Sequence, residues 1–389
     1  MDVHLPQGGM VVTSKKDYCA RMKAIRVNDE YLPFSYCFDF DKIFTFSHLW
    51  KSYKNCKKGV NWKASTHKFT ANALLLIFRL YVALHNGTFR SYGFYEFDIF
   101  ERGKKRHIRS VKIEERVVQR CLCDYSLTPA LSRHFIYDNG ACLKGKGFDF
   151  SFNRLKCHLQ KHYRKHGKEG YILLFDFSKF FDNISHEEIK SILSKEYRDK
   201  RITKLLFHFI DMFGDKGIGL GSQISQIIAL TSANKLDHYI KEQLHVKYYG
   251  RYMDDGYLIG ATKEELQYYL EKIKEKCDEL HITLNTKKTR IVKLSHGFTF
   301  LKAKHSICDD GRIVREIARE SVTRMRRKLT KLRKRLNYGL IEIEDIETAY
   351  VSWEGHAKRF NSYKTRESMK KKLDEIRSEH NEVLQSQTR

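Results

Sequence analysis

The chain has 389 residues, which is enough for two or three lobes that each bury a core. Its 73 lysines and arginines outnumber its 47 aspartates and glutamates, and the formal net charge of +26 is spread along the whole length. This charge predicts a polyanionic partner, for which nucleic acid is the obvious candidate. No long apolar run or signal-peptide pattern is present, so we expect no membrane association. The nine cysteines include no C-x-x-C pair, which predicts free thiols in a reducing cytoplasm.

Changes in composition along the chain predict four regions of an α+β protein. Residues 1–42 show no clear period and are expected to form an N-terminal extension whose role the sequence does not reveal. Residues 43–166 are basic and aromatic, whereas residues 167–305 alternate short apolar strands with amphipathic helices. This alternation predicts a small antiparallel sheet backed by helices. Residues 306–389 are predicted to be helical and basic.

Within the third region, individual elements can be placed. Residues 170–176 predict a buried strand with a carboxylate at its end, and the Ser-x-x-Glu pattern at 185–188 is a capping box that opens a helix. The proline-free segment 225–243 predicts one long helix. The Thr-x-x-Glu pattern at 262–265 opens another helix, whose apolar residues recur at helical spacing.

A 3-4-3-4 apolar stripe near the C-terminus predicts a long amphipathic helix; its members are Val322, Met325, Leu329, Leu332 and Leu336. Basic residues crowd the rest of this helix: Arg324, Arg326, Arg327, Lys328, Lys331, Arg333, Lys334 and Arg335. A run of charge is usually only a solvated face, but one nearly free of acids favours phosphate contacts. We therefore expect a helical lobe that lies on a duplex.

The most informative motif is Tyr252-Met253-Asp254-Asp255, which lies between two β-prone segments with Asp-Asp-Gly as turn chemistry. It predicts a β-hairpin with two adjacent carboxylates at its tip. Like charges this close repel unless a cation lies between them. Together with Asp176 at the end of a strand, the pair could hold two Mg²⁺ ions about 4 Å apart for phosphoryl transfer. One ion would activate a 3′-hydroxyl, and the other would stabilise the leaving pyrophosphate.

A glycine-rich turn, residues 217–226, lies between these two carboxylate sites and leads into a helix. Glycines permit a close approach of the backbone, and the N-terminus of a helix offers free N–H groups to a nucleotide or a template strand. Such a turn is weak evidence alone. Its place between Asp176 and the Asp pair predicts that it belongs to the same site.

Taken together, these segments resemble the palm motifs of reverse transcriptases over roughly residues 45–365. The resemblance implies a right-hand polymerase in which residues 43–166 are the fingers, 167–305 a ferredoxin-like palm and 306–389 the thumb. It also implies two Mg²⁺ ions, for which Mn²⁺ could substitute, an RNA template, an RNA/DNA duplex and dNTPs. Asp176, Asp254, Asp255 and Lys288 would be catalytic, and Phe177 would join the three aspartates in holding metal.

Other residues receive roles only through this resemblance. Arg106, Arg116, Phe181 and Gln226 would bind the incoming dNTP, and the Phe181 ring, five residues after Asp176, would exclude a 2′-hydroxyl. Template and primer contacts would come from Leu220, Gly221, Ser225, Tyr252, Met253 and Leu301. Leu301 belongs to a segment similar to the primer-grip turn, but Lys302 stands where that family usually has glycine. The geometry of this turn is therefore an open question.

Within the family, Leu220-Gly221-x-x-x-Ser225-Gln226 is similar to the enzymes of diversity-generating retroelements, as is the segment 352–363. This resemblance implies error-prone copying of an RNA and a small basic accessory protein, in a bacterial or phage-encoded cytoplasmic enzyme. An antiphage defence reverse transcriptase, acting alone or with another reverse-transcriptase subunit, is the alternative. A non-catalytic RNA-binding protein similar to a maturase is a third interpretation, which the complete set of aspartates disfavours.

Several residues have competing interpretations. Lys288 could protonate pyrophosphate or only contact phosphate, and Arg106 or Arg116 could pair with an acid such as Glu114 instead of a nucleotide. Histidines at 158, 162 and 166 recur at helical spacing, which is compatible with zinc but more typical of a basic face toward nucleic acid.

Overall fold

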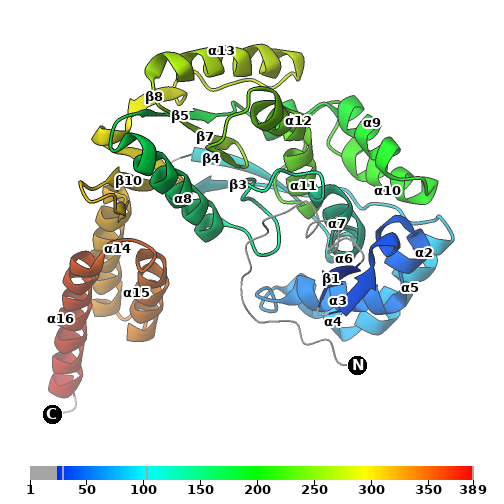
Figure 1. Ribbon diagram of the computed structural model, residues 1–389. Helices are drawn as coiled ribbons and strands as arrows, with labels where there is room; N and C mark the ends of the chain where they lie inside the picture. Colours follow the sequence, from blue (N-terminus) through cyan, green and yellow to red (C-terminus); the bar gives the residue numbers. More distant parts are fainter. Residues whose placement is uncertain (1–23, 29, 102–103, 388–389) are drawn as a thin grey trace, which may run out of the picture. The chain divides into compact units, whose positions relative to one another are not determined.

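The computed structural model describes residues 24–28, 30–101 and 104–387 (Figure 1). These residues form two compact units that alternate along the chain. The first contains the described residues up to Ile136, together with Lys179–His238 and Asp278–Thr283. The second contains Tyr137–Ser178, Tyr239–Cys277 and the described chain from Leu284 onward. The division into fingers, palm and thumb remains a prediction.

The first unit is mainly helical and carries two separate β-ribbons. Its ribbons are β1 (Ala24–Val27) with β2 (Glu30–Pro33), and β3 (Phe94–Glu101) with β4 (Lys104–Val111). Its helices are α2 (Phe40–Ile43), α3 (Phe46–Lys57), α4 (Ala64–Ala71), α5 (Ala73–His85), α6 (Ile113–Leu122), α7 (Thr128–Ser132), α9 (His186–Glu196), α10 (Lys200–Asp211), α11 (Gln223–Ser232) and α12 (Asn234–His238). Among the described residues no single helix is long and apolar enough to cross a membrane, although α4 and α5, joined at a bend of 82°, reach that length and composition together.

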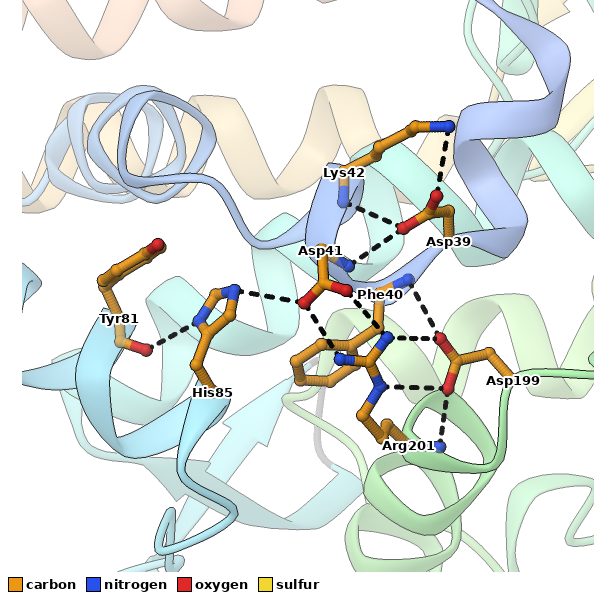
Figure 2. Close-up of polar contacts among 8 residues, drawn as sticks. All are labelled: Asp39, Phe40, Asp41, Lys42, Tyr81, His85, Asp199 and Arg201. Carbon is orange, nitrogen blue, oxygen red and sulfur yellow. Dashed lines mark hydrogen bonds and ion pairs between the residues drawn. The ribbon is translucent and has the colours of Figure 1, made fainter.

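The described part of the predicted N-terminal extension is anchored to the first unit by a network of ion pairs (Figure 2). The guanidinium of Arg201 on α10 donates to both carboxylate oxygens of Asp41 on α2, at 2.9 Å each, and to Asp199 at 3.0 Å. It also lies over the Phe40 ring, 4.7 Å from its centroid. The His85 imidazole at the end of α5 lies 3.5 Å from Asp41. Phe40 itself is buried, so this segment contributes to the core of the unit.

Ser185 and Thr262 cap helices where the sequence predicts, although the Glu265 carboxylate accepts the N–H of Ala261 and not that of Thr262. The predicted long helix is interrupted. The Ser185 hydroxyl accepts the N–H of Glu188 at the start of α9. The segment expected to be helical from 225 to 243 instead forms α11, α12 and a short π-helical turn, Tyr239–Gln243, with a break at Ala233. At the end of α11 the Thr231 and Ser232 hydroxyls donate to main-chain carbonyls of the preceding turn. Such bonds compete with the helix ladder, which favours a break.

The second unit contains the predicted antiparallel sheet. Its strand order is β6 (Tyr249–Tyr252), β7 (Asp255–Gly260), β5 (Tyr171–Asp176) and β8 (Arg290–Lys293), and every pairing is antiparallel. The helices α8 (Phe148–His166) and α13 (Lys263–Glu279) lie on opposite sides of this sheet (Figure 1). Leu155 and Leu159 of α8 share one buried cluster with residues of β5 and β7. The α+β class is therefore confirmed.

Two of the three histidines predicted on one face of α8, His158 and His162, face the interior and not nucleic acid, whereas His166 is exposed. His158 and His162 are 3% and 1% exposed. His158 Nδ1 lies 2.9 Å from the hydroxyl of Tyr257, and His162 Nε2 lies 2.8 Å from the carbonyl of Glu169. Helical spacing predicted their common face correctly, but at His158 and His162 that face is buried in the protein.

A second small sheet and three helices complete this unit. The sheet is β9 (Phe298–Phe300), β10 (Ala303–Ile307) and β11 (Ile313–Ile317), so the helical region begins at Arg319 and not at residue 306. The helices are α14 (Arg319–Asn337), α15 (Ile343–Ala357) and α16 (Tyr363–Gln387). The predicted apolar stripe is confirmed, because Met325, Leu329 and Leu336 of α14 lie in the core of this helical bundle.

Candidate active site

The end of β5 and the start of β7 bring two of the predicted aspartates together. Asp176 and Asp255 are register partners in the antiparallel pairing of these strands. Asp255 is also the partner of Tyr252 across the predicted hairpin. A hairpin was therefore predicted correctly, and its tip lies beside the last residue of the central strand. The position follows from the register, since a slip by one residue would place the two carboxylates on opposite faces of the sheet.

The turn of this hairpin consists of Met253 and Asp254 alone. Met253 has a φ of 54°, in the left-handed region that residues other than glycine rarely adopt. Gly256, expected as part of the turn, lies within β7 instead. Its role is steric, because Phe175 of β5 leaves no room for a Cβ there. The carbonyl of Asp254 accepts the N–H of Phe177 at 3.1 Å, which ties the turn to the chain that follows β5.

The three aspartates interact electrostatically. Burial, followed by the charges of Asp254 and Asp176, raises the pKa of Asp255 to about 7 against the opposing effect of Lys288. A carboxylate that resists ionisation between two others is the expected result of crowding negative charge without a compensating cation. The site therefore has the electrostatics predicted for an acidic metal-binding cluster.

Two side chains from the loop before β8 contact Asp176. The Lys288 ammonium lies 2.5 Å from one carboxylate oxygen, and the Asn285 amide donates to the other at 3.2 Å. The Asn285 N–H also donates to the Asp176 carbonyl at 2.7 Å. The sequence alone assigns no role to Asn285. Its position as the residue that anchors the lysine loop to the strand end follows only from the fold.

The residues present fit divalent metal ions by their chemistry. Asp176, Asp254 and Asp255 supply only hard carboxylate oxygens, the ligands that Mg²⁺ prefers. As the side chains stand, no group of three or more His, Cys, Asp or Glu residues within the described chain is arranged to hold a metal. At this site the oxygens of Asp176 are hydrogen-bonded to Lys288 and Asn285.

The turn similar to a primer grip has a defined geometry. Leu301 and Lys302 form a two-residue turn between β9 and β10, with φ values of 49° and 63°. Positive φ at both central positions is the type I′ turn of tight hairpins. Lys302 thus adopts the backbone conformation for which glycine is suited, which answers the question left open by the sequence. Tyr252, also expected near the primer, stacks on Phe148 of α8 with ring centroids 4.8 Å apart.

The glycine-rich loop lies in the first unit and is paired with β4. The Arg109 N–H donates to the Leu220 carbonyl at 3.1 Å. Gly221 has a φ of 116°, and a Cβ there would lie 2.8 Å from the Arg109 carbonyl oxygen. The close backbone approach that this glycine permits is therefore to the protein's own strand. In α11 the Gln226 side chain is exposed, whereas the buried Ser225 hydroxyl has no hydrogen-bond partner within the described residues.

The predicted nucleotide-binding residues are also in the first unit. Arg106 is exposed on the ribbon of β3 and β4. The Arg116 guanidinium donates to the Ser110 hydroxyl at 2.7 Å and makes no ion pair with any described acid, so the expected alternative with Glu114 does not occur. Phe181 is half-buried and packs edge-on against the buried Phe180. One ring of this pair therefore belongs to the core, and the other is partly accessible.

A groove of about 440 Å³ opens beside Arg116 in the first unit. It lies between the β3–β4 ribbon and the helices α3 and α4, and its lining combines basic and aromatic side chains, namely Lys63, Lys68, Lys112, Arg116, Tyr95, Phe97 and Phe69. Cations beside aromatic faces are typical of surfaces that bind unpaired nucleic acid.

The predicted site residues thus divide between the two units. The second unit brings together Asp176, Phe177, Asp254, Asp255, Lys288, Tyr252, Met253 and Leu301. The first unit carries Arg106, Arg116, Phe181, Leu220, Gly221, Ser225 and Gln226.

An antiparallel sheet that gathers aspartates at one edge is typical of the palm of a nucleic-acid polymerase. The family model described as reverse transcriptase (RNA-dependent DNA polymerase) matches residues 100–305, more than half of the chain. The chain therefore belongs to the reverse transcriptase family, which confirms the right-hand polymerase class predicted from the sequence. Enzymes of this family generally depend on divalent metal ions. No curated protein matches the chain in sequence.

Solved structures of telomerase are similar at low identity. Apo telomerase from Candida tropicalis, truncated at its C-terminal domain, is 14% identical with a TM-score of 0.45, covering 58% of this chain and 55% of that one. Telomerase from Candida albicans in complex with a fragment of telomeric RNA is 12% identical with a TM-score of 0.46, covering 74% and 61%. The chain thus spans about three fifths of the length of these structures or less.

Proposed function

We propose that the chain is an RNA-directed DNA polymerase that makes cDNA on an RNA template. The observation that carries this proposal is the electrostatic coupling of Asp176, Asp254 and Asp255 at one sheet edge. A module that only binds RNA gains nothing from three repelling carboxylates, whereas phosphoryl transfer requires them. The free thiols of the described cysteines agree with the proposed cytoplasmic setting.

The three aspartates and Phe177 would hold two Mg²⁺ ions, or Mn²⁺ in their place. Bound there, the metals would lower the pKa of the primer hydroxyl and neutralise charge on the phosphates. The protein's own contribution is to fix the carboxylates on two paired strands and in a tied turn. Rigid placement of this kind lowers the cost of orienting the reacting groups.

Lys288 has two proposed roles, and its environment favours phosphate contact. Burial lowers the pKa of its ammonium, but the hydrogen bond and the charge of Asp176 outweigh burial, so the net pKa is raised. An ammonium with a raised pKa is a weaker acid at neutral pH and remains charged. Lys288 is therefore suited to hold a negatively charged phosphate near Asp176.

The basic face of α14 would hold the duplex. Arg324, Arg327, Lys328, Lys331, Lys334 and Arg335 are exposed on this helix, whose opposite side is buried in the helical bundle. Phosphate contacts of this kind are independent of sequence and weaken with salt. They suit a polymerase that must slide along its product.

The finer assignment proposed is the error-prone enzyme of a diversity-generating retroelement, with a small basic accessory protein as partner. Leu220 supports it, because group II intron and retroviral-type reverse transcriptases usually have glutamine at the corresponding position. An aliphatic side chain cannot donate the hydrogen bond that glutamine would supply near the newly formed base pair. Loss of such a bond would weaken discrimination by about 1–3 kcal/mol. A defence enzyme that makes a dedicated DNA product, alone or with another reverse-transcriptase subunit, is the second candidate.

The polymerase proposal is tested by primer extension on an RNA template with Mg²⁺. Asp254→Asn should abolish synthesis while RNA affinity stays within about twofold, and Asp278→Asn, an exposed aspartate at the end of α13, is the matched control. Equal loss in both variants, or no synthesis by the unmodified chain with any primer, would support the binding-only interpretation. Sequencing the cDNA made on co-purified RNA would then separate the two finer assignments, since errors concentrated at template adenines are expected only for the retroelement enzyme.

A further inference from the structure

Arg251, the residue before Tyr252, is completely buried. Its side chain is 1% exposed and is the largest of the fully buried side chains in the described chain. A guanidinium removed from water is costly unless its donors are satisfied by the protein. Its contacts therefore deserve a functional explanation, because a neutral side chain would fill the same space without this cost.

The Arg251 guanidinium donates to the carbonyl of Met253, at 2.8 Å. Met253 is the residue of the hairpin turn that adopts a left-handed φ of 54°. In this conformation a side chain with a Cβ crowds the following carbonyl, at a cost that glycine avoids. A hydrogen bond from a charged donor to that carbonyl stabilises the peptide between Met253 and Asp254 in the orientation observed.

The main chain of Arg251 is fixed on the side away from β7. Its N–H donates to the carbonyl of Asp138 at 3.1 Å, and its carbonyl accepts the N–H of Gly140 at 2.9 Å. The Asp138 carboxylate is itself held by Arg154 at 2.5 Å and by Lys241 at 3.1 Å. The guanidinium thus extends from a rigid anchor to the turn.

We propose that Arg251 is a positioning residue that locks the Met253–Asp254 peptide and so aims the carboxylates of Asp254 and Asp255. The second peptide of the turn is held independently, because the Asp254 carbonyl accepts the N–H of Phe177. Without Arg251 the Met253 carbonyl loses this charge-assisted hydrogen bond, and rotation about Met253 would change the direction in which the chain enters Asp254. The functional consequence of this inference rests on the proposed polymerase activity, whereas its structural core does not.

The primary variant is Arg251→Lys, which keeps the charge but loses the planar fork of donors. Hydrogen–deuterium exchange is measured on the full chain for peptides covering residues 251–257, and binding of Mn²⁺ alone is followed by electron paramagnetic resonance. We expect exchange in the turn to become about tenfold faster and Mn²⁺ affinity to fall about tenfold, the scale of a lost charge-assisted bond. Tyr257→Phe, which removes a buried hydrogen bond to His158 in the same sheet, is the matched control for lost stability.

A second pair of variants distinguishes loss of the hydrogen bond from Arg251 to Met253 from general destabilisation. Glycine adopts a left-handed φ without strain, so in a Met253→Gly background the turn should no longer depend on the guanidinium. We expect Arg251→Lys to change turn exchange by less than about threefold in that background. The same tenfold effect in both backgrounds would overturn the proposal, as would unchanged exchange and Mn²⁺ affinity in a folded Arg251→Lys protein. Altered exchange together with an unmodified chain that makes no DNA would reject only the proposed activity.

Discussion

Replacement of Gly256 by alanine should disturb the candidate active site through packing alone. Gly256 follows Asp255 in β7 and is the register partner of Phe175 in β5. An added Cβ would lie 2.2 Å from Cζ of the Phe175 ring and 2.6 Å from each Cε. Because carbon atoms in contact are separated by about 3.5–4.0 Å, the ring or the strand must move by more than about 1 Å.

The ring has little freedom to give way. Phe175 is 2% exposed and lies in the central strand of the sheet. Overpacking of this kind costs about 1–3 kcal/mol, and each kcal/mol should lower the melting temperature by about 2–4 °C. If β7 moves instead, Asp255 moves with it, and a displacement of 1 Å at reacting groups can cost about 100-fold in rate.

Thermal unfolding and primer extension would be measured on Gly256→Ala and on Gly355→Ala as the control. Gly355 lies within α15 with no atom within 4 Å of an added Cβ, so alanine there should stabilise by about 0.5–1 kcal/mol. Adding Phe175→Leu to Gly256→Ala should restore part of the loss, since it removes the clashing ring. A Gly256→Ala protein with unchanged melting temperature and rate would refute the reasoning, and so would a double variant no better than the single one.

Other predictions follow from the turns, the charges and the rings. Lys302→Gly should raise the free energy of unfolding by about 1 kcal/mol in urea titrations, because it relieves a left-handed φ; a loss of stability would contradict this. The pKa of Asp255 is raised to about 7, so its contribution to metal-free stability is present below about pH 4 and is lost as the pH rises through 7. Asp255→Asn should therefore flatten the dependence of the melting temperature on pH between these values. An unchanged dependence on pH would argue against it. Phe181→Ala should admit ribonucleotides in primer extension, whereas unchanged selectivity between dNTPs and rNTPs would reject a steric role. Lys328→Gln should reduce the slope of log affinity for duplex against log salt by about 1, and an unaltered slope would remove this lysine from the interface.

Much of the candidate site was predictable because its motifs are local. A hairpin depends on residues next to one another, so the turn at Met253 and Asp254 follows from β-prone flanks and a short polar connection. Capping boxes and the apolar stripe of α14 are local for the same reason. The order of the motifs, with Asp176 first and the pair later, was enough to predict that they converge.

The errors occurred where distant residues decide the environment. The histidines of α8 have the spacing of a metal site, but whether that face meets solvent or a sheet depends on β5 and β7. Gly221 permits a close approach to the backbone of Arg109, which the sequence does not reveal, while its template contact stays a prediction. The helix break at Ala233 also went unpredicted, because neither proline nor glycine marks it.

By itself the sequence determined which chemistry the chain carries, since the types of residue and their order fix the donors that a site can contain. Only the tertiary structure decided how those donors interact. The raised pKa of Asp255 requires the register of two strands, and the anchoring of Lys288 requires a loop that binds the end of β5. The role proposed for Arg251 depends on the Met253 carbonyl, which lies 2.8 Å from the guanidinium in a turn with a left-handed φ. Distance and burial set these energies, and both depend on contacts between residues that are far apart in the chain.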